Sequence, residues 1–569
     1  MSRRDLSLLA LLLVIQGLLV WGTFVTAPHP GGDNAAYVAL GHSLHSGQGY
    51  KELWDPQAPP HTKYPPVFPM MLAGAMALGA SGWLGLKLVT ASLALVAVVG
   101  TFLWARRRLG SEVGFGVALL AGLSPSLLYH SHWVLSDVPF LAFTLLALWA
   151  LEGVQGENGR SVGDEDGPIW GIVSWSLWGS VAFVFLAYFT RSAGLPLLLA
   201  AVGALALRRR WRGATAVAAA VGVPALAWIL RGRAAGPGEG RYGSEFFLLD
   251  PYQPDLGRAG IGDFVQRVTE NVVGYGGAYL PETVFGSAGA AMVALGMVLM
   301  VLALVGWVRA LRTGPGVAEL FVPLYAGLIL LWPPIWSGDR FVLPLVPLIL
   351  VFAVEGGRAA TARMGGSARQ WLFLVGVLVV GGPGLRDWFQ SRAEGAACKS
   401  AAEAEGPWAC GGSALVDFVA AARWAGEHLP QGSAALTRKP RIWYLMSGIP
   451  TRTYPFTEAP GVLLEEADRV GATYVVLDYI GSQGTRFVGA AMAISPERFC
   501  QLAVFGGEGG LPPTRLLQLV PEADSYGSRL EEDGIRLSTC PGPPSPEFVT
   551  DTRAPGAWTI PILRRAARP

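Results

Sequence analysis

The chain has 569 residues, of which 52% are hydrophobic and only 15% are charged. So few charged groups cannot coat a globule of this length, which excludes an ordinary water-soluble protein and predicts that lipid covers much of the surface. The formal net charge of +2 says little about partners. No basic stretch is interleaved with aromatic residues, so nothing in the sequence indicates a nucleic-acid partner.

Eleven apolar runs have the length of a membrane span, and we predict a polytopic α-helical membrane protein with about 11 transmembrane helices. The first run, Leu6 to Ala27, could also be a signal peptide, but the many runs that follow favour an uncleaved anchor. The predicted spans are 6–27, 83–105, 113–129, 134–151, 170–188, 193–207, 213–230, 285–308, 318–335, 341–356 and 371–384.

Basic clusters set the predicted orientation, since Lys and Arg are retained on the cytoplasmic side of short loops. Placing every cluster inside requires an even number of crossings between successive clusters, and the predicted spans satisfy this condition. The last span then sends the tail to the extracytoplasmic side. The clusters are Arg3–Arg4, Arg106–Arg108, Arg208–Arg212, Arg309–Arg312 and Arg358–Arg369.

The apolar segment Pro65 to Ala80 is bracketed by Pro and Gly and is short for a span. If it crossed the bilayer, the Arg106–Arg108 cluster would face outward. We therefore predict a re-entrant or interfacial helix on the outer face, with a spanning helix as the alternative.

The transmembrane domain is predicted to cover residues 1–388, with long outer loops at 28–82 and 231–284. These loops hold much of the polar chemistry. The expected location is the cell (inner) membrane, with the active site on the periplasmic or extracytoplasmic side.

Residues 389–569 lack apolar runs and are predicted to form a small extracytoplasmic α/β domain. Periodicity predicts helices at 415–428 and 462–470. Short strands are predicted at 434–437 and 474–477.

All the cysteines of the chain lie in this tail, which is typical of an oxidising compartment. Sequence proximity favours two disulfides, Cys398 with Cys410 and Cys500 with Cys540, among three connectivities. Four unpaired thiols in a cytosolic tail are the alternative.

The first outer loop carries the sequence Gly-Gly-Asp33-Asn34-Ala-Ala-Tyr37. A carboxylate just after the first span is well placed to accept a proton from an acceptor hydroxyl. Asp33 also precedes a predicted helix at 35–44, and spacing alone favours a helix N-cap. Asn34, Tyr37 and Tyr64 are candidate substrate-pocket residues.

The second outer turn contains His130, His132 and Asp137. Asp137 lies at the outer end of a span, where it could cap the helix or join Asp33 in catalysis. Residues two apart point to different faces of a helix, which argues against a metal held by the two histidines. We keep His132 as a candidate pocket residue and predict no metal ligand.

Three cations lie on the predicted outer face: Lys63, Arg191 and Arg340. Arg340 stands where a late span re-enters the membrane, and its planar guanidinium suits the phosphate of a lipid at that depth. An interfacial Arg that reaches toward phospholipid headgroups is the structural alternative.

The order of these features resembles the GT-C glycosyltransferases, most nearly the branch of protein O-mannosyltransferases and lipid A aminoarabinose transferases. The resemblance covers residues 1–390 and rests on Asp33 with a following Tyr, Lys63-Tyr-Pro-Pro, Asp137, and Arg340-Phe-x-x-Pro-x-x-Pro. The tail stretches 424–430 and 472–478 are similar to extracytoplasmic domains that many members append.

The resemblance implies an inverting transferase that uses a polyprenyl-phosphate sugar and acts on an extracytoplasmic acceptor at the lipid bilayer. Asp33 then matches the catalytic carboxylate, while Arg340 and Lys63 match the groups expected to bind the donor phosphate. Many relatives carry a second acid where this chain has Asn34, so the role of that neighbour is open. No cofactor is expected, and a divalent metal is possible but not required.

Two other function classes remain at this point. A transporter or flippase for a lipid-linked intermediate would show internal repeats and mid-span charges, whereas here Lys87 is the main mid-span exception. A membrane-anchored binding protein would keep its full activity in the tail alone.

Overall fold

The structure is a computed structural model that describes residues 1–156, 175–235, 242–253, 256–507, 512–521, 537–541 and 547–565. The chain divides into two compact units. Unit 1 comprises Met1–Phe24, Thr62–Phe68 and Thr90–Glu394, and unit 2 comprises Val25–His61, Pro69–Val89 and Gly395–Pro569. Residues 28–61 of the predicted first outer loop therefore belong to the same unit as the tail.

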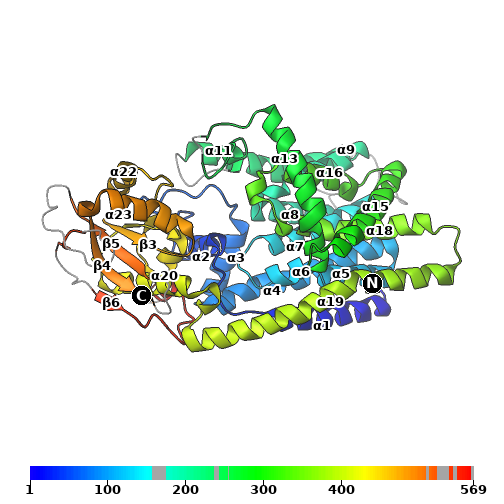
Figure 1. Cartoon of the computed structure of the whole chain (residues 1–569). Coiled ribbons are helices and arrows are strands. Elements are labelled where there is room, and N and C mark those ends of the chain that lie inside the picture. The colour runs from blue at the N-terminus through cyan, green and yellow to red at the C-terminus, as the bar shows by residue number, and fades with distance from the viewer. Residues whose placement is uncertain are drawn as a thin grey trace. The chain divides into compact units, whose positions relative to one another are not determined.

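Unit 1 is helical in the residues that the structure describes (Figure 1). Its helices are α1 (Arg3–Thr23), α5 (Ser111–Gly122), α6 (Pro125–His130), α7 (Asp137–Gly156), α8 (Trp175–Thr190), α9 (Leu195–Leu207), α10 (Trp211–Val217), α11 (Val223–Ala234), α12 (Tyr242–Glu245), α13 (Ile261–Gly274), α14 (Leu280–Phe285), α15 (Ala290–Thr313), α16 (Val317–Leu331), α17 (Asp339–Val342) and α18 (Val346–Ala360). Three helices contribute residues to both units: α3 (Val67–Ala77), α4 (Trp83–Leu109) and α19 (Gly366–Glu405).

A helix lies at each apolar run in the described part of the chain, and the protein is a multi-pass membrane protein. Among these residues, six helices are long and apolar enough to cross a membrane, and others are shorter. The six are Arg3–Thr23, Trp83–Leu109, Trp211–Ala234, Ala290–Thr313, Asp339–Ala360 and Gly366–Glu405. The count of eleven crossings stays a prediction, and the start of the predicted span 170–188 lies outside the described residues.

The ambiguous segment at 65–80 forms the short helix α3. Its 11 residues rise about 16 Å, roughly half the thickness of a bilayer's hydrocarbon core. A helix of this length cannot cross the core unaided, which favours the re-entrant or interfacial assignment.

Helices α15 and α18 pack side by side in unit 1 (Figure 1). A Cβ atom on Gly306 would collide with the backbone carbonyl of Phe352, and one on Gly356 would collide with that of Leu302. Small residues let helix backbones approach closely in membranes, where van der Waals contact drives association. Both glycines are therefore needed for this crossing.

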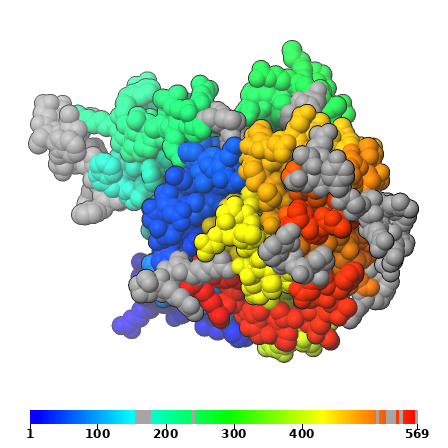
Figure 2. Space-filling view, turned by 90° about the vertical axis from the view of Figure 1, so that its left-hand side faces the viewer, coloured from blue at the N-terminus to red at the C-terminus, as the bar shows by residue number. Residues whose placement is uncertain are grey.

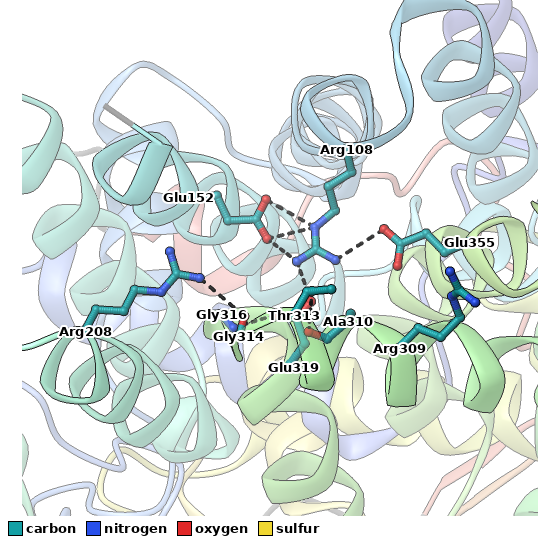
Figure 3. A pocket seen from close by; sticks show the side chains of 11 residues that line it. Arg108, Glu152, Arg208, Arg309, Ala310, Thr313, Gly314, Gly316, Glu319 and Glu355 are labelled. Carbon is teal, nitrogen blue, oxygen red and sulfur yellow. Dashed lines mark hydrogen bonds and ion pairs between the residues drawn. The ribbon is translucent and has the colours of Figure 1, made fainter. Parts of the chain in front are cut away.

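A pocket of about 470 Å³ in unit 1 contains an ionic network centred on Arg108 (Figure 3). Its guanidinium nitrogens lie 2.7 Å from Glu152 Oε1, 2.5 Å from Glu319 Oε1 and 3.6 Å from Glu355 Oε1. Three carboxylates converge on one buried cation, so the network ties α4 to α7, α16 and α18.

Unit 2 contains a mixed six-stranded sheet in the order β2-β1-β3-β5-β4-β6. The three strands β2, β1 and β3 are parallel, β5 is antiparallel to β3 and to β4, and β6 is parallel to β4. The strands are β1 (Ala435–Leu436), β2 (Thr451–Arg452), β3 (Tyr474–Leu477), β4 (Phe499–Phe505), β5 (Thr514–Leu519) and β6 (Glu547–Val549).

Helices lie on both faces of this sheet (Figure 1). Val475 and Leu477 point to one face, where they pack with Leu463 of α22 and Met492 of α23. Helix α20 packs against β4 and β5. The helices of unit 2 are α2 (Gly32–His45), α20 (Ser413–His428), α21 (Pro440–Ser447), α22 (Pro460–Val470), α23 (Ala490–Ile494) and α24 (Pro561–Arg565).

The helices and strands expected near 415–428, 434–437, 462–470 and 474–477 are present as α20, β1, α22 and β3. Two disulfides join Cys398 to Cys410 and Cys500 to Cys540, the pairs that sequence proximity favours. Within unit 2, α2 packs on α21. Figure 2 shows the surface of the tail in yellow to red.

Candidate functional site

Asp33 lies in the first turn of α2, in unit 2. The helix begins at Gly32 and its N-cap residue is Gly31, so Asp33 is not the cap that spacing alone favours. A carboxylate in a first helical turn is stabilised by the helix dipole. The side chain is 38% exposed and therefore reachable from solvent.

Two cations from the start of α21 lie beside this turn. Arg441 Nη1 is 3.7 Å from Asp33 Oδ1, and the Arg441 guanidinium lies 5.5 Å from the ring centre of Trp54. The ammonium of Lys439 donates a hydrogen bond to the carbonyl of Pro30 at 3.1 Å. These cations were not among the predicted site residues, although Arg438, Lys439 and Arg441 form a basic run in an otherwise apolar stretch.

The other predicted pocket residues of α2 are buried. Asn34 is 1% exposed and Tyr37 is 4% exposed. Their side chains belong to the interior of unit 2, whereas the carboxylate of Asp33 reaches the surface.

Lys87, the one cation noted within a predicted span, is fully buried in unit 2. Its ammonium donates hydrogen bonds to the carbonyls of Val25, at 2.7 Å, and Ala27. This lysine provides hydrogen-bond donors to backbone carbonyls just after α1. Its burial within a predicted span is therefore explained by these hydrogen bonds, without a role in ion transport.

In unit 1, Asp137 and Arg191 form an ion pair. Asp137 opens α7 and is 2% exposed, and Arg191 follows the last residue of α8. Burial alone would lower the pKa of Arg191, but the Asp137 carboxylate raises it above its usual value. Arg191 therefore stays charged, with its guanidinium 4.9 Å from the ring centre of Phe341.

Arg340 is close enough to Arg191 for their charges to repel. The phenols of Tyr242, Tyr275 and Tyr325 also interact electrostatically with Arg191. Two guanidinium groups held together by the fold form a site suited to an anion with more than one negative charge. We call Arg191, Arg340 and Lys63 the unit 1 cation cluster.

Lys63, the third member, is held by aromatic and acidic neighbours. Its ammonium is 2.9 Å from Glu245 Oε1 and 5.1 Å from the ring centres of both Tyr242 and Trp336. The ring of Tyr64, a predicted pocket residue, lies 6.2 Å from that of Tyr242. Tyr242 therefore connects the Lys63 region electrostatically to Arg191.

The turn that carries Arg340 is fixed by its neighbour Asp339. Ser126 Oγ donates a hydrogen bond to Asp339 Oδ2 at 2.7 Å, and His130 Nε2 lies 3.3 Å from the same oxygen. The ring of His132 instead lies 6.0 Å from that of Phe24. Both histidine rings also lie near the ring of Tyr129, at 5.1 Å for His130 and 6.1 Å for His132. Among the residues that the structure describes, no group of three or more His, Cys, Asp or Glu side chains is placed to hold a metal ion.

The cluster was only partly visible in the sequence. Arg191 and Arg340 were identified by their position beside predicted spans, and Lys63 by its place before the short apolar segment 65–80. Tyr242, Tyr275 and Tyr325 were missed, because a lone tyrosine in a long loop or an apolar helix carries no motif.

No protein-family model and no curated protein matches this chain. Solved structures do match it. ArnT from Cupriavidus metallidurans bound to undecaprenyl phosphate is similar over 91% of this chain and 99% of its own, with a TM-score of 0.54 and 13% identity. The Archaeoglobus fulgidus oligosaccharyltransferase in complex with Zn and sulfate is similar over 88% of this chain and 72% of its own, with a TM-score of 0.52 and 13% identity.

Both neighbours are GT-C glycosyltransferases, and at such low identity the likeness concerns the fold. It extends over membrane helices and tail alike, since about nine-tenths of this chain is covered in each comparison. The chain therefore has the fold of the GT-C glycosyltransferases, the group that the order of its outer-loop motifs resembles.

Proposed function

We propose that this protein is an inverting glycosyltransferase that moves a sugar from a polyprenyl-phosphate donor to an extracytoplasmic acceptor hydroxyl. The single observation that carries the proposal is the pairing of Asp137 with Arg191 beside Arg340, which holds one guanidinium group close to a second. Fixed cations stabilise the charge that develops on a phosphate leaving group. The structural neighbour ArnT is bound to undecaprenyl phosphate, a ligand of this class.

In the proposed reaction, the acceptor hydroxyl attacks the anomeric carbon of the donor sugar from the side opposite the phosphate. The bond between the anomeric carbon and the phosphate oxygen breaks, and its electron pair stays on the phosphate. Asp33 accepts the proton of the hydroxyl, as a general base. Arg340, Arg191 and Lys63 bind the phosphate as its negative charge grows.

Asp137 serves in this scheme as a positioning residue, because its carboxylate binds Arg191 and keeps the guanidinium oriented. Asn34, Tyr37, Tyr64 and His132 stay proposed pocket residues. The proposed setting is the inner membrane, with this chemistry on the extracytoplasmic side.

Product analysis in cells tests the proposal. Cells that lack the gene are complemented with the wild-type chain, Asp33→Asn or Asp468→Asn, and their glycans and glycolipids are compared by mass spectrometry. Asp468 is an exposed carboxylate of unit 2 and provides the matched control. We expect a product that requires the wild-type chain, persists with Asp468→Asn and disappears with Asp33→Asn at equal protein levels. A product that persists with Asp33→Asn would remove the assignment of the base.

A further inference from the structure

The carboxyl ends of three parallel strands in unit 2 carry polar residues that the proposed reaction does not use. Strands β2, β1 and β3 lie side by side and run in the same direction. Tyr454 follows β2, Thr437 and Arg438 follow β1, and Asp478 follows β3. In sheets of this kind, ligands bind at the crevice outside the carboxyl ends of the strands.

Several buried polar atoms at this edge have no hydrogen-bond partner among the described residues: Thr437 Oγ1, Arg438 Nη1, Tyr454 Oη, Asp478 Oδ2 and Gln483 Oε1. Thr437 and Asp478 are 0% exposed and Tyr454 is 1% exposed. Leaving a buried polar atom unpaired is costly, so a cluster of them indicates groups that a ligand completes. Donors and acceptors occur together, which matches a ligand rich in hydroxyl groups.

These atoms come from separate loops but face one another. Tyr454, Asp478 and Arg438 interact electrostatically. A Cβ atom on Gly481 would lie 3.0 Å from both Arg438 Nη1 and Gln483 Oε1. The glycine therefore lets the loop after β3 approach the guanidinium closely, and a larger side chain would displace Arg438 or Gln483.

The charges at this edge favour an anion. Lys439 interacts electrostatically with Arg438, Arg441, Asp478 and Asp33, so all five groups share one neighbourhood within unit 2. Three are cations and two are carboxylates, which leaves an excess positive charge. Burial acts on both kinds of charge here, since it raises the pKa of the Asp478 carboxyl and lowers the pKa of the Lys439 ammonium.

We propose that the group of residues at these strand ends, Thr437, Arg438, Tyr454, Asp478 and Gln483, which we call the crevice, binds an anionic sugar-like acceptor through its phosphate or carboxylate group. This inference rests on the proposed transferase and names the acceptor class. Arg438 binds the anionic group, and the uncharged side chains bind neighbouring hydroxyls. Lys439 and Arg441 connect the crevice to Asp33, whose Oδ1 is 3.7 Å from Arg441 Nη1, so an acceptor held here presents a hydroxyl to that carboxylate.

Isothermal titration of the full-length protein in detergent micelles tests the site with three probes: glucose 6-phosphate, glucuronate and glucose. We expect the wild-type chain to bind one or both anions at least tenfold more tightly than glucose. Binding of glucose 6-phosphate alone assigns a phosphate, and binding of glucuronate alone assigns a carboxylate. Equal binding of glucose, or no binding of either anion, would overturn the proposal.

Variants locate the binding. Arg438→Gln and Gly481→Val should each weaken anion binding at least tenfold, and Arg438→Lys should weaken it less than Arg438→Gln. Arg469→Gln, which alters a half-exposed arginine of α22, should bind like wild type. Unchanged binding in both Arg438→Gln and Gly481→Val would reject the crevice. A thermal unfolding midpoint without ligand shows that each variant is folded.

The titration contains no donor lipid, so the two proposals fail separately. A chain that binds an anion through Arg438 but yields no transfer product in cells would overturn the transferase alone. A chain that transfers sugar but binds neither anion would overturn the acceptor crevice alone.

Discussion

The Asp137 carboxylate binds the Arg191 guanidinium where α7 begins and α8 ends. The aspartate is almost fully buried and the arginine is mostly buried. Water therefore cannot solvate either charge well if its partner is removed. The pair therefore joins two helices and also orients a cation proposed to bind phosphate.

Replacing Asp137 should cost stability as well as activity. Asp137→Asn leaves Arg191 buried without its carboxylate, and breaking a buried pair from one side costs about 3–5 kcal/mol. We expect a lower thermal unfolding midpoint in detergent and loss of the cellular product. The double variant Asp137→Asn/Arg191→Gln should recover part of the midpoint but none of the product. If the double variant regained product, Arg191 would have no place at the donor phosphate.

Arg340 should act on turnover more than on folding. Removing one hydrogen-bond donor that stabilises transition-state charge lowers enzyme rates by about 10²–10³-fold. Lys keeps the positive charge but lacks the planar, forked guanidinium of Arg. Membranes with equal amounts of each variant should form product about 10²-fold more slowly with Arg340→Gln and at an intermediate rate with Arg340→Lys. Arg369→Gln, an exposed arginine of α19, is the control. A normal rate with Arg340→Gln would favour the headgroup-binding alternative.

Glucuronate binding at the crevice should depend on the pH. Burial lowers the pKa of Lys439. The neighbouring charges of Arg438 and Arg441 lower it further, whereas those of Asp478 and Asp33 raise it. An anion binds the protonated lysine more tightly, so affinity should fall as the pH rises, and the fall should begin below the pH at which a solvated lysine titrates. Glucuronate is suitable because its own carboxylate stays ionised throughout. In Lys439→Arg the cation persists, and this fall should vanish.

The crossing of α15 and α18 should tolerate no side chain at Gly356. Gly356→Leu places bulk against the backbone of Leu302, and overpacking of this kind costs about 1–3 kcal/mol or more. The adjacent Gly357 has no atom near its hypothetical Cβ, so Gly357→Leu provides a matched control. Thermal unfolding should separate the two variants, and equal midpoints would show that the helices can part without penalty.

The predicted orientation can be tested by cysteine labelling, since every native cysteine is in a disulfide. Lys51→Cys, in the first predicted outer loop, should react with a membrane-impermeant maleimide in intact cells. Thr313→Cys, at the exposed end of α15 beside a predicted inner cluster, should react only after the membrane is opened. The reverse pattern would contradict the assigned topology.

Local patterns in the sequence were enough for much of the fold. Apolar runs located the longer apolar helices of unit 1, but not α12, α13 and α14, which follow the predicted span 213–230. The short run at 65–80 became the 11-residue helix α3. Likewise, the buried strand ending at Leu477 followed from its composition. Each of these features depends on the character of consecutive residues, which the chain displays directly.

Tertiary neighbours could not be found in that way. Nothing near Asp33 in the chain indicates Arg441, because their approach depends on how α2 packs on α21. Similarly, Arg438 Nη1 and the phenol of Tyr454 are buried only because the strands assemble into the sheet. The residues proposed to bind the sugar donor were therefore predictable where they flank spans, and the residues proposed to bind the acceptor were not.

The hydrogen bond from Lys439 to Pro30 joins residues 409 positions apart. During synthesis the carboxylate of Asp33 leaves the ribosome long before its cationic neighbours exist, so a chain interrupted ahead of β1 can insert its spans without completing the environment of its proposed base. Truncated products would thus occupy the membrane as inactive proteins, and an active chain would form only when the final quarter of the sequence has been translated.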